Sequence, residues 1–121
     1  MSGASSRETV SEFRKRREAQ NEILMKYAGL GMKRFLSLDS QLYREGELPA
    51  KVKELLGLTA SLVLRCDDCI LYHLFRCREE GVSDGELEET LSIGLLVGGS
   101  IVIPHLRRAI EHWDGMKNEA S

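Results

Sequence analysis

Residues 66–73 read Cys66-Asp67-Asp68-Cys69-Ile70-Leu71-Tyr72-His73, a Cys-x-x-Cys pair followed by a histidine about one helical turn later. At about 100° per residue on a helix, Cys66 and Cys69 lie roughly 60° apart, and Cys69 and His73 lie roughly 40° apart. All three side chains would therefore share one helix face. Two neighbouring thiols with an imidazole beside them indicate a dithiol redox centre that has its own base.

The sequence around this stretch has helical rather than strand periodicity, so we expect an all-α fold. Helices are predicted over about 9–27, 32–43, 50–64, 66–81, 84–98 and 100–113. The chain would form one domain over residues 1–121, with N-terminal helices at 8–45 packing on a core made by 50–114. Residues 1–6 are expected to be disordered and the tail from Gly115 to be loose. Because the middle of the first helix is polar, we expect this helix to pack against a partner subunit or to lie on the surface of the domain.

Local signals mark several of these helix ends. Thr9 with Glu12, and Ser83 with Glu86, have the spacing of a capping box, and Ser6 is an alternative first cap. A left-handed helix cap is predicted where glycine follows the fourth helix, at Gly81. Gly94 and Gly98 are spaced for close approach of a neighbouring helix, and Pro104 requires a first-turn position or a kink.

Composition narrows the class of protein. The chain of 121 residues is 42% hydrophobic and 30% charged, which is ordinary for a globular protein. A net charge of -2 argues against nucleic-acid binding. The sequence contains no apolar stretch of the ~18–20 residues needed to cross a bilayer, and its N-terminus lacks the apolar core of a secretory signal. We therefore expect a cytoplasmic protein, whose three cysteines are not a disulfide scaffold.

Thiol chemistry proceeds through the thiolate, so the attacking cysteine needs a lowered pKa. The N-terminus of a helix and His73 would both favour the thiolate. Asp67 and Asp68 oppose it, but we expect them to point outward and to matter less than a histidine contact. The reaction that fits is attack of one thiolate on a peroxide or disulfide, followed by capture by the other thiol.

Glu54 lies twelve positions before Cys66, and with Cys-x-x-Cys-x-x-x-His this spacing resembles the alkyl hydroperoxidase D (AhpD) branch of the carboxymuconolactone decarboxylase-like family. The stretch 81–87 and the Gly98-Gly99 pair resemble the same family, so that the likeness covers about residues 50–113. On one straight helix Glu54 and Cys66 would lie about 18 Å apart. A bend between Leu62 and Cys66 is therefore required if Glu54 belongs to the site.

The resemblance implies an AhpD-like six-helix bundle that assembles as a homotrimer or homohexamer. It also implies peroxidase or disulfide-reductase activity without a cofactor, with a hydroperoxide as substrate and a dithiol as reductant. Cys69 would attack and Cys66 would resolve, while His73 and Glu54 would form a proton relay. The best-studied members have a further histidine directly before the second cysteine, where this chain has Asp68.

Two other functions remain open. A decarboxylase on the same scaffold would not need the cysteine pair, but it would need a basic group for a substrate carboxylate; the candidates are Arg65, Arg76, Arg107 and Arg108. A non-catalytic or metal-binding oligomeric module is the other alternative, although zinc prefers four ligands and the stretch offers three. Additional ligands would have to be Cys77, His105 or His112. Without metal, we expect a buried structural thiol at Cys77, surface positions for both histidines, and Trp113 as an apolar plug.

Overall fold

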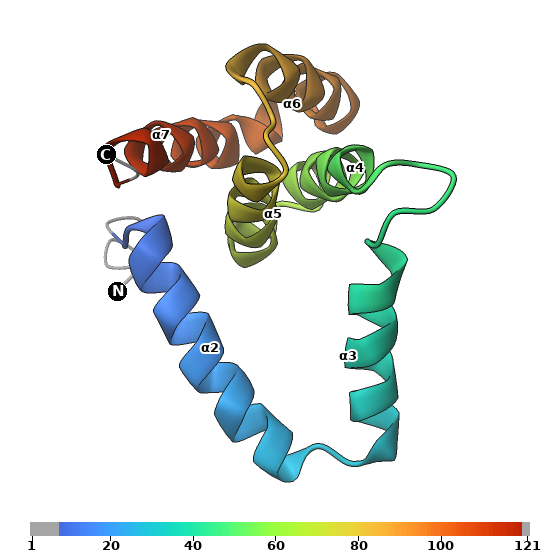
Figure 1. Cartoon of the computed structure of the whole chain (residues 1–121). Helices are drawn as coiled ribbons and strands as arrows, with labels where there is room; N and C mark the ends of the chain where they lie inside the picture. The colour runs from blue at the N-terminus through green and yellow to red at the C-terminus, as the bar shows by residue number, and fades with distance from the viewer. Residues whose placement is uncertain (1–7, 120–121) are drawn as a thin grey trace.

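The computed structural model describes residues 8–119, which form six α-helices and one short 3₁₀ helix (Figure 1). The elements in chain order are α2 (Val10–Tyr27), α3 (Leu30–Leu42), α4 (Ala50–Val63), α5 (Asp67–Glu79), α6 (Asp84–Gly98), η1 (Ser100–Val102) and α7 (Ile103–Glu119). No strand occurs among these residues, so the all-α prediction is confirmed. None of the described helices has the length and hydropathy that a membrane span requires. The predicted disorder at residues 1–6 and the alternative cap Ser6 lie outside the described residues.

The predicted helix ends are observed with their expected chemistry. The Thr9 hydroxyl accepts a hydrogen bond from the Glu12 backbone N–H at 3.0 Å, and the Glu12 carboxylate accepts from the Thr9 N–H at 2.9 Å. Ser83 and Glu86 form the same reciprocal box at the start of α6. Gly81 has a φ of 76°, the left-handed conformation that favours glycine.

The C-terminal tail does not follow the prediction. A loose segment from Gly115 was expected, but α7 continues to Glu119. Met116 is buried in the core on the same helix face as Trp113, and this packing extends the helix beyond the polar residues. Trp113 is the expected apolar plug, and its indole N–H also donates to Asp84 at 2.8 Å.

The core lies between the helices α4 to α7, with α4 packed against both α5 and α6. Leu58 and Leu62 of α4 are fully buried there. A Cβ added to Gly94 would lie 2.9 Å from the Leu62 side chain, so this glycine permits the close approach of α4 and α6. Pro104 is the second residue of α7, in the first turn, where its missing N–H removes no hydrogen bond.

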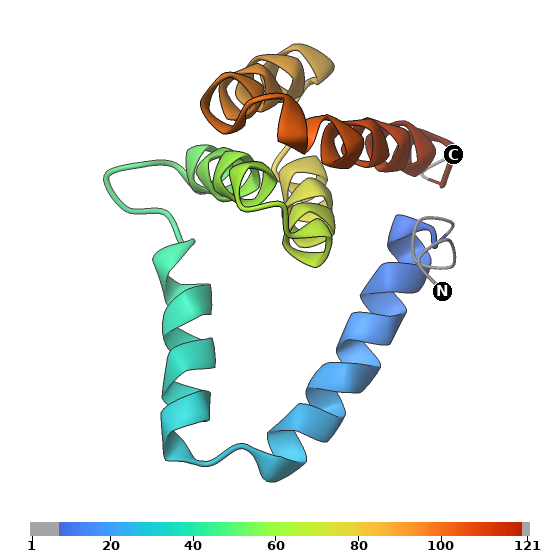
Figure 2. The ribbon, with the colours of Figure 1, turned by 180° about the vertical axis from the view of Figure 1, so that it is seen from behind.

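The first two described helices extend from this core as two arms that meet near residues 28–29 (Figures 1 and 2). The α2 arm reaches the core through Val10 and Phe13 at its N-terminal end, whereas α3 buries none of its residues. Both arms leave large apolar side chains in solvent, and Phe35 is 69% exposed. We call this set the arm face: Ile23, Leu24, Met25, Tyr27, Leu30, Met32, Phe35, Leu36, Leu38 and Leu42.

A sharp turn connects α4 to α5 and places them side by side. Arg65 has a φ of 59°, and it is the only non-glycine among residues 8–119 with a positive φ. The Cys66 N–H donates back to the Ser61 carbonyl at 3.1 Å, which closes the turn. The bend that the sequence required between Leu62 and Cys66 is thus present, and it brings α5 back along α4.

Candidate active site

The two cysteines of the motif lie at the start of α5. Cys66 is the N-cap residue, and its sulfur accepts a hydrogen bond from the Cys69 N–H at 3.4 Å. Cys69 follows in the first helical turn. Both thiols are free, with Cys66 half-buried and Cys69 more exposed. The sulfur of Cys66 therefore occupies the place where a helix N-terminus best stabilises negative charge.

The environment of Cys69 corrects one expectation. Burial, the hydrogen bond with the Cys66 thiol and the charges of Asp68 and Asp39 raise the pKa of Cys69 to about 11. Although much of the residue is exposed, its thiol faces a cavity, so that its ionised form loses hydration. The expectation of a lowered pKa is wrong for this thiol, although Asp68 is only one of the smaller causes of the rise. A thiolate at Cys69 would therefore need a base to take the proton.

The buried carboxylate of Glu54, on the neighbouring helix α4, holds the His73 ring in place. Its Nδ1 lies 2.8 Å from Glu54 Oε1, and the Glu54 side chain is fully buried. Because an ionised carboxylate can only accept, Nδ1 carries the proton and donates it, which leaves the lone pair on Nε2. Nε2 in turn faces the hydroxyl of Tyr43 at 3.4 Å. The imidazole is thus fixed in a tautomer whose free nitrogen can act as a base.

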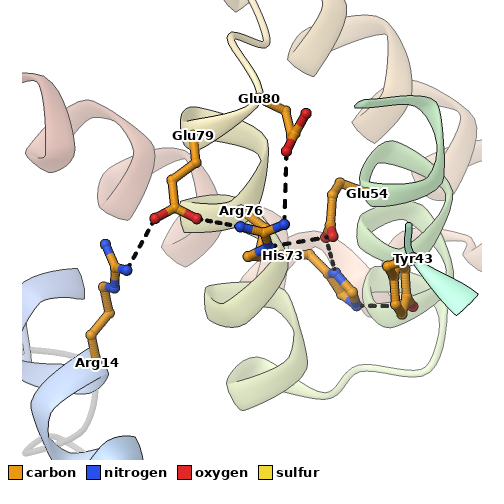
Figure 3. A network of polar contacts seen from close by, with 7 residues as sticks. All are labelled: Arg14, Tyr43, Glu54, His73, Arg76, Glu79 and Glu80. Carbon is orange, nitrogen blue, oxygen red and sulfur yellow. Dashed lines mark hydrogen bonds and ion pairs between the residues drawn. The ribbon is translucent and has the colours of Figure 1, made fainter. Parts of the chain in front are cut away.

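Arg76 completes the surroundings of Glu54 (Figure 3). Its Nε lies 3.5 Å from Glu54 Oε2, an oxygen that has no hydrogen-bond donor among the described residues. The rest of the guanidinium contacts Glu79 and Glu80, at 2.6 and 3.7 Å. The buried carboxylate therefore has a cation on one side and the imidazole on the other, which offsets the unfavourable burial of its charge.

Cys69, His73 and Tyr43 line one cavity of about 250 Å³ between α2, α3 and α5. Phe13, Arg17, Gln20, Asp39, Asp68 and Tyr72 also line it. The rings of Tyr43 and Tyr72 each have their centroids 5.1 Å from that of His73, and thereby enclose the imidazole. Glu54 does not line this cavity but contacts His73, so predicted site residues from two distant parts of the sequence lie together.

Three residues of this site were not found from the sequence as parts of a thiol centre: Tyr43, Gly57 and Arg76. A Cβ on Gly57 would lie 2.6 Å from His73 Cε1 and 2.8 Å from the Tyr43 hydroxyl. Glycine inside a helix costs roughly 1 kcal/mol relative to alanine, so an unexplained mid-helix glycine is itself a signal of close packing. Tyr43 has no comparable signal, because it is 30 residues from His73 in sequence.

Comparison with known proteins decides the family. The sequence pattern of the carboxymuconolactone decarboxylase family matches residues 30–112, well over half of the chain. The chain belongs to the carboxymuconolactone decarboxylase family. The match begins at α3, so it includes Tyr43 as well as the motif from Glu54 to His73. The resemblance stated from residues 50–113 is confirmed and extends further toward the N-terminus.

Solved members of this family have the same fold. The protein TM1620 of Thermotoga maritima is 53% identical, with a TM-score of 0.88 over 90% of this chain and 96% of that chain. A second structure of TM1620, 58% identical, has a TM-score of 0.75 over 77% of this chain and 96% of its own. It is described as a carboxymuconolactone decarboxylase family protein with a suggested role in the antioxidative response.

The chain is also similar to two more distant relatives. The family member lpg0406 of Legionella pneumophila is 25% identical, with a TM-score of 0.80 over 88% of this chain and 95% of that chain. An uncharacterized protein of Cupriavidus necator is 28% identical over 101 residues, covering 78% of this chain and 89% of its own. These relatives match nearly their whole length.

The remaining histidines and the third cysteine lie away from the relay. Cys77 is fully buried, and burial raises the pKa of its thiol to about 12. His112 is buried, contrary to the predicted surface position, and burial lowers its pKa. His105 is half-buried and contacts Asp67. No group of three His, Cys, Asp or Glu side chains within residues 8–119 is arranged to hold a metal ion.

Gly57→Ala tests how tightly α4 packs against His73 and Tyr43. The added methyl group would force the His73 ring and the Tyr43 hydroxyl to move, so we expect thiol-dependent turnover to fall by about tenfold and stability by about 1–3 kcal/mol. Gly115→Ala is the matched control, because a Cβ added at Gly115 would have no atom within 4 Å. That variant should keep full activity and gain a few tenths of a kcal/mol. Equal behaviour of the two variants would contradict the packing argument.

Alkylation rates test the acidity of Cys69. A thiol is unreactive when protonated, and the pKa of Cys69 is raised to about 11. Its alkylation by iodoacetamide, followed by peptide mass mapping, should therefore rise about tenfold per pH unit from pH 7 to 9. Cys77 should react only after denaturation. A rate for Cys69 that levels off below pH 8 would show that the thiol is more acidic than its surroundings predict.

Proposed function

We propose that this protein is a thiol-dependent hydroperoxidase or disulfide reductase that uses Cys66 and Cys69 as its redox pair. The observation that carries the proposal is the shared cavity of Cys69, His73 and Tyr43, with His73 oriented by the buried Glu54. The suggested antioxidative role of the TM1620 relative supports it. The substrate would be a hydroperoxide and the reductant a dithiol, and a reducing cytoplasm would keep the pair reduced between turnovers.

The proposed reaction begins when Cys69 gives up its proton and its sulfur attacks the terminal oxygen of the hydroperoxide. A sulfur–oxygen bond forms, the oxygen–oxygen bond breaks, and the leaving alkoxide takes a proton and departs as an alcohol. Cys66 then attacks the sulfenic acid at Cys69, so that a disulfide forms and water leaves. A dithiol donor reopens the disulfide by thiol exchange and supplies the two electrons.

The relay explains how a thiol of high pKa can react. Nε2 of His73 can accept the proton, directly or through the Tyr43 hydroxyl, while Glu54 stabilises the imidazolium that forms. The same imidazolium can return the proton to the leaving alkoxide. In this mechanism Tyr43 takes the place that the additional histidine has in the best-studied relatives. Asp68, which occupies that sequence position here, lines the cavity without contacting His73.

Stoichiometric oxidation tests the proposal. One equivalent of hydroperoxide added to the reduced protein should remove two thiols, and peptide mass mapping should find the Cys66–Cys69 disulfide with Cys77 still reduced. Several dithiol donors should then be compared in a turnover assay. The proposal fails if the pair stays reduced while free thiols in solution are oxidised.

The decarboxylase alternative has less support from the site. Among the candidate arginines, Arg76 contacts the site through Glu54, but its guanidinium is already paired with Glu54, Glu79 and Glu80. Arg65 belongs to the turn before α5, and Arg108 contacts Asp67. At Arg76 and Arg108, a substrate carboxylate would therefore have to displace an existing ion pair. Lactone-acid decarboxylation that survives in a Cys66→Ser variant would favour this alternative.

We also propose that the protein assembles as a homotrimer or homohexamer, as the resemblance implies. The arm face supports assembly, because its ten large apolar side chains are each at least 37% exposed and a second copy could cover them. A second copy would cover this face and hold α3, which carries Tyr43 just after its last turn. Sedimentation should give a mass of three or six chains, and Phe35→Glu should shift the population toward monomer. A wild-type monomer at micromolar concentration would contradict assembly.

A further inference from the structure

The two aspartates between the cysteines are each bound by a different helix. Asp67 Oδ1 lies 2.7 Å from His105 Nδ1, and its Oδ2 lies 3.1 Å from Arg108 Nη2; both partners belong to α7. Asp68 Oδ1 lies 3.6 Å from Arg16 Nη2 on α2. The segment that separates the two thiols is therefore held from both sides by cationic or hydrogen-bonding groups.

The Asp67 contact is the more closely built of the two. Arg108 has its Nε buried without a hydrogen-bond partner among the described residues. The His105 side chain is only 20% exposed. Because the Asp67 carboxylate can only accept, His105 Nδ1–H donates to it, and both groups hold the carboxylate at the helix start. The Asp68 contact is longer, and Arg16 is shared with Glu8 at 2.9 Å.

The charge of these aspartates matters because each is adjacent in sequence to a cysteine of the pair. A carboxylate close to a thiolate disfavours it, and Asp68 is among the groups that raise the pKa of Cys69. A guanidinium bound to the carboxylate cancels most of this repulsion at a distance of a few ångströms. Arg108 thus holds the carboxylate of the residue that directly follows Cys66.

We propose that Arg108, supported by His105, is a positioning residue for the redox pair: it holds and neutralises Asp67 and so sets how readily Cys66 ionises. The significance for turnover rests on the proposed thiol function, but the inference concerns thiol reactivity and is tested without turnover. The charged or titratable groups that surround the pair come from four helices. They are Asp67, Asp68, Tyr72 and His73 on α5, Arg16 and Arg17 on α2, Asp39 on α3 with Tyr43 at its end, and His105, Arg108 and His112 on α7.

An electrostatic role and a purely structural role of the Asp67–Arg108 contact predict different results for two substitutions. Arg108→Gln leaves Asp67 uncompensated, so the thiolate at Cys66 should become less populated. Asp67→Asn leaves Arg108 uncompensated, so the thiolate should become more populated. If the contact only kept the segment folded, both substitutions would loosen the same contact and change reactivity in the same direction. The double variant should return close to the parent if the charges are what matters.

The experiment uses the full chain with Cys69→Ser, so that Cys66 is the one motif thiol and Cys77 remains buried. Iodoacetamide alkylation of Cys66 is followed at pH 7 by peptide mass mapping. Arg108→Gln should slow it about 2- to 10-fold, Asp67→Asn should accelerate it about as much, and the double variant should lie within about twofold of the parent. Arg107→Gln, which removes an exposed neighbouring arginine on α7, is the matched control and should have no effect.

Circular dichroism first establishes that each variant is folded. If Arg108→Gln is not folded, Arg108→Lys replaces it; this variant keeps the charge, and its Cys66 should be alkylated at the parent rate. The direction in which Asp67→Asn changes the alkylation rate then tests the electrostatic role. Shifts in the same direction, or shifts no larger than that of the Arg107 control, overturn the proposal. The outcome is separable from the proposed function, because a chain without peroxidase activity can still show opposite shifts, and an active peroxidase can fail to show them.

Discussion

Replacing Cys69 by serine is expected to lower peroxide turnover by about 10³-fold or more, because a hydroxyl cannot perform the attack that a thiolate performs. Cys69 is the only cysteine of the described residues that lines the cavity with His73 and Tyr43. Turnover with a dithiol donor, measured as loss of hydroperoxide, provides the test.

Two further cysteine variants make this result specific. Cys66→Ser should consume about one equivalent of peroxide and then stop, because the sulfenic acid at Cys69 has no resolving partner. Cys77→Ala removes a thiol that is fully buried outside the site, and it should retain turnover. Activity retained in Cys69→Ser but lost in Cys66→Ser would reverse the two roles. That outcome would agree with the position of Cys66 at the helix N-terminus.

Replacing Glu54 by glutamine is expected to lower turnover by about 10²-fold, the usual contribution of a positioned acid–base system. The amide has nearly the same shape, so His73 can still donate to its oxygen. It lacks the negative charge, however, and the imidazolium that forms when His73 takes a proton is no longer stabilised. The measurement is kcat/KM against pH, with thermal unfolding as a check that the fold is retained.

Glu79→Gln is the matched control for this substitution. Glu79 also contacts Arg76, at 2.6 Å, but it lies at the surface and not against the imidazole. Its turnover should stay within about twofold of wild type. If Glu54→Gln behaves like Glu79→Gln, the buried carboxylate is a structural partner of Arg76 and not part of a relay.

The sequence predicted the local features well, because each depends on neighbours within one or two turns. The capping boxes at Thr9 and Ser83 and the left-handed Gly81 all involve groups at most a few residues apart. The sulfur cap at Cys66 was not predicted, although it also joins groups only three residues apart. The helical end of α7 was missed because Met116 gains its stability from the distant core, which no local pattern reports.

Parts of the site depend on contacts that the sequence does not encode locally. Glu54 was expected at the site through family spacing, and the turn at Arg65 is what brings it to His73. Tyr43 reaches the imidazole from another helix, and the partners of Asp67 come from α7, 38 residues away for His105. The rise in the pKa of Cys69 arises from burial in a cavity between three helices, which exists only after they pack.

By itself, then, the order of residues determined the helical class, the capped helix starts at Thr9 and Ser83, and the thiol pair with its adjacent histidine, because hydrogen bonds and side-chain spacing along one helix are fixed by 3.6 residues per turn. Only the tertiary structure decided which groups surround that pair: a buried carboxylate, a tyrosine, and an arginine and histidine on its aspartate. Electrostatic and packing effects act over a few ångströms of space regardless of sequence distance, so the chain must fold before they exist.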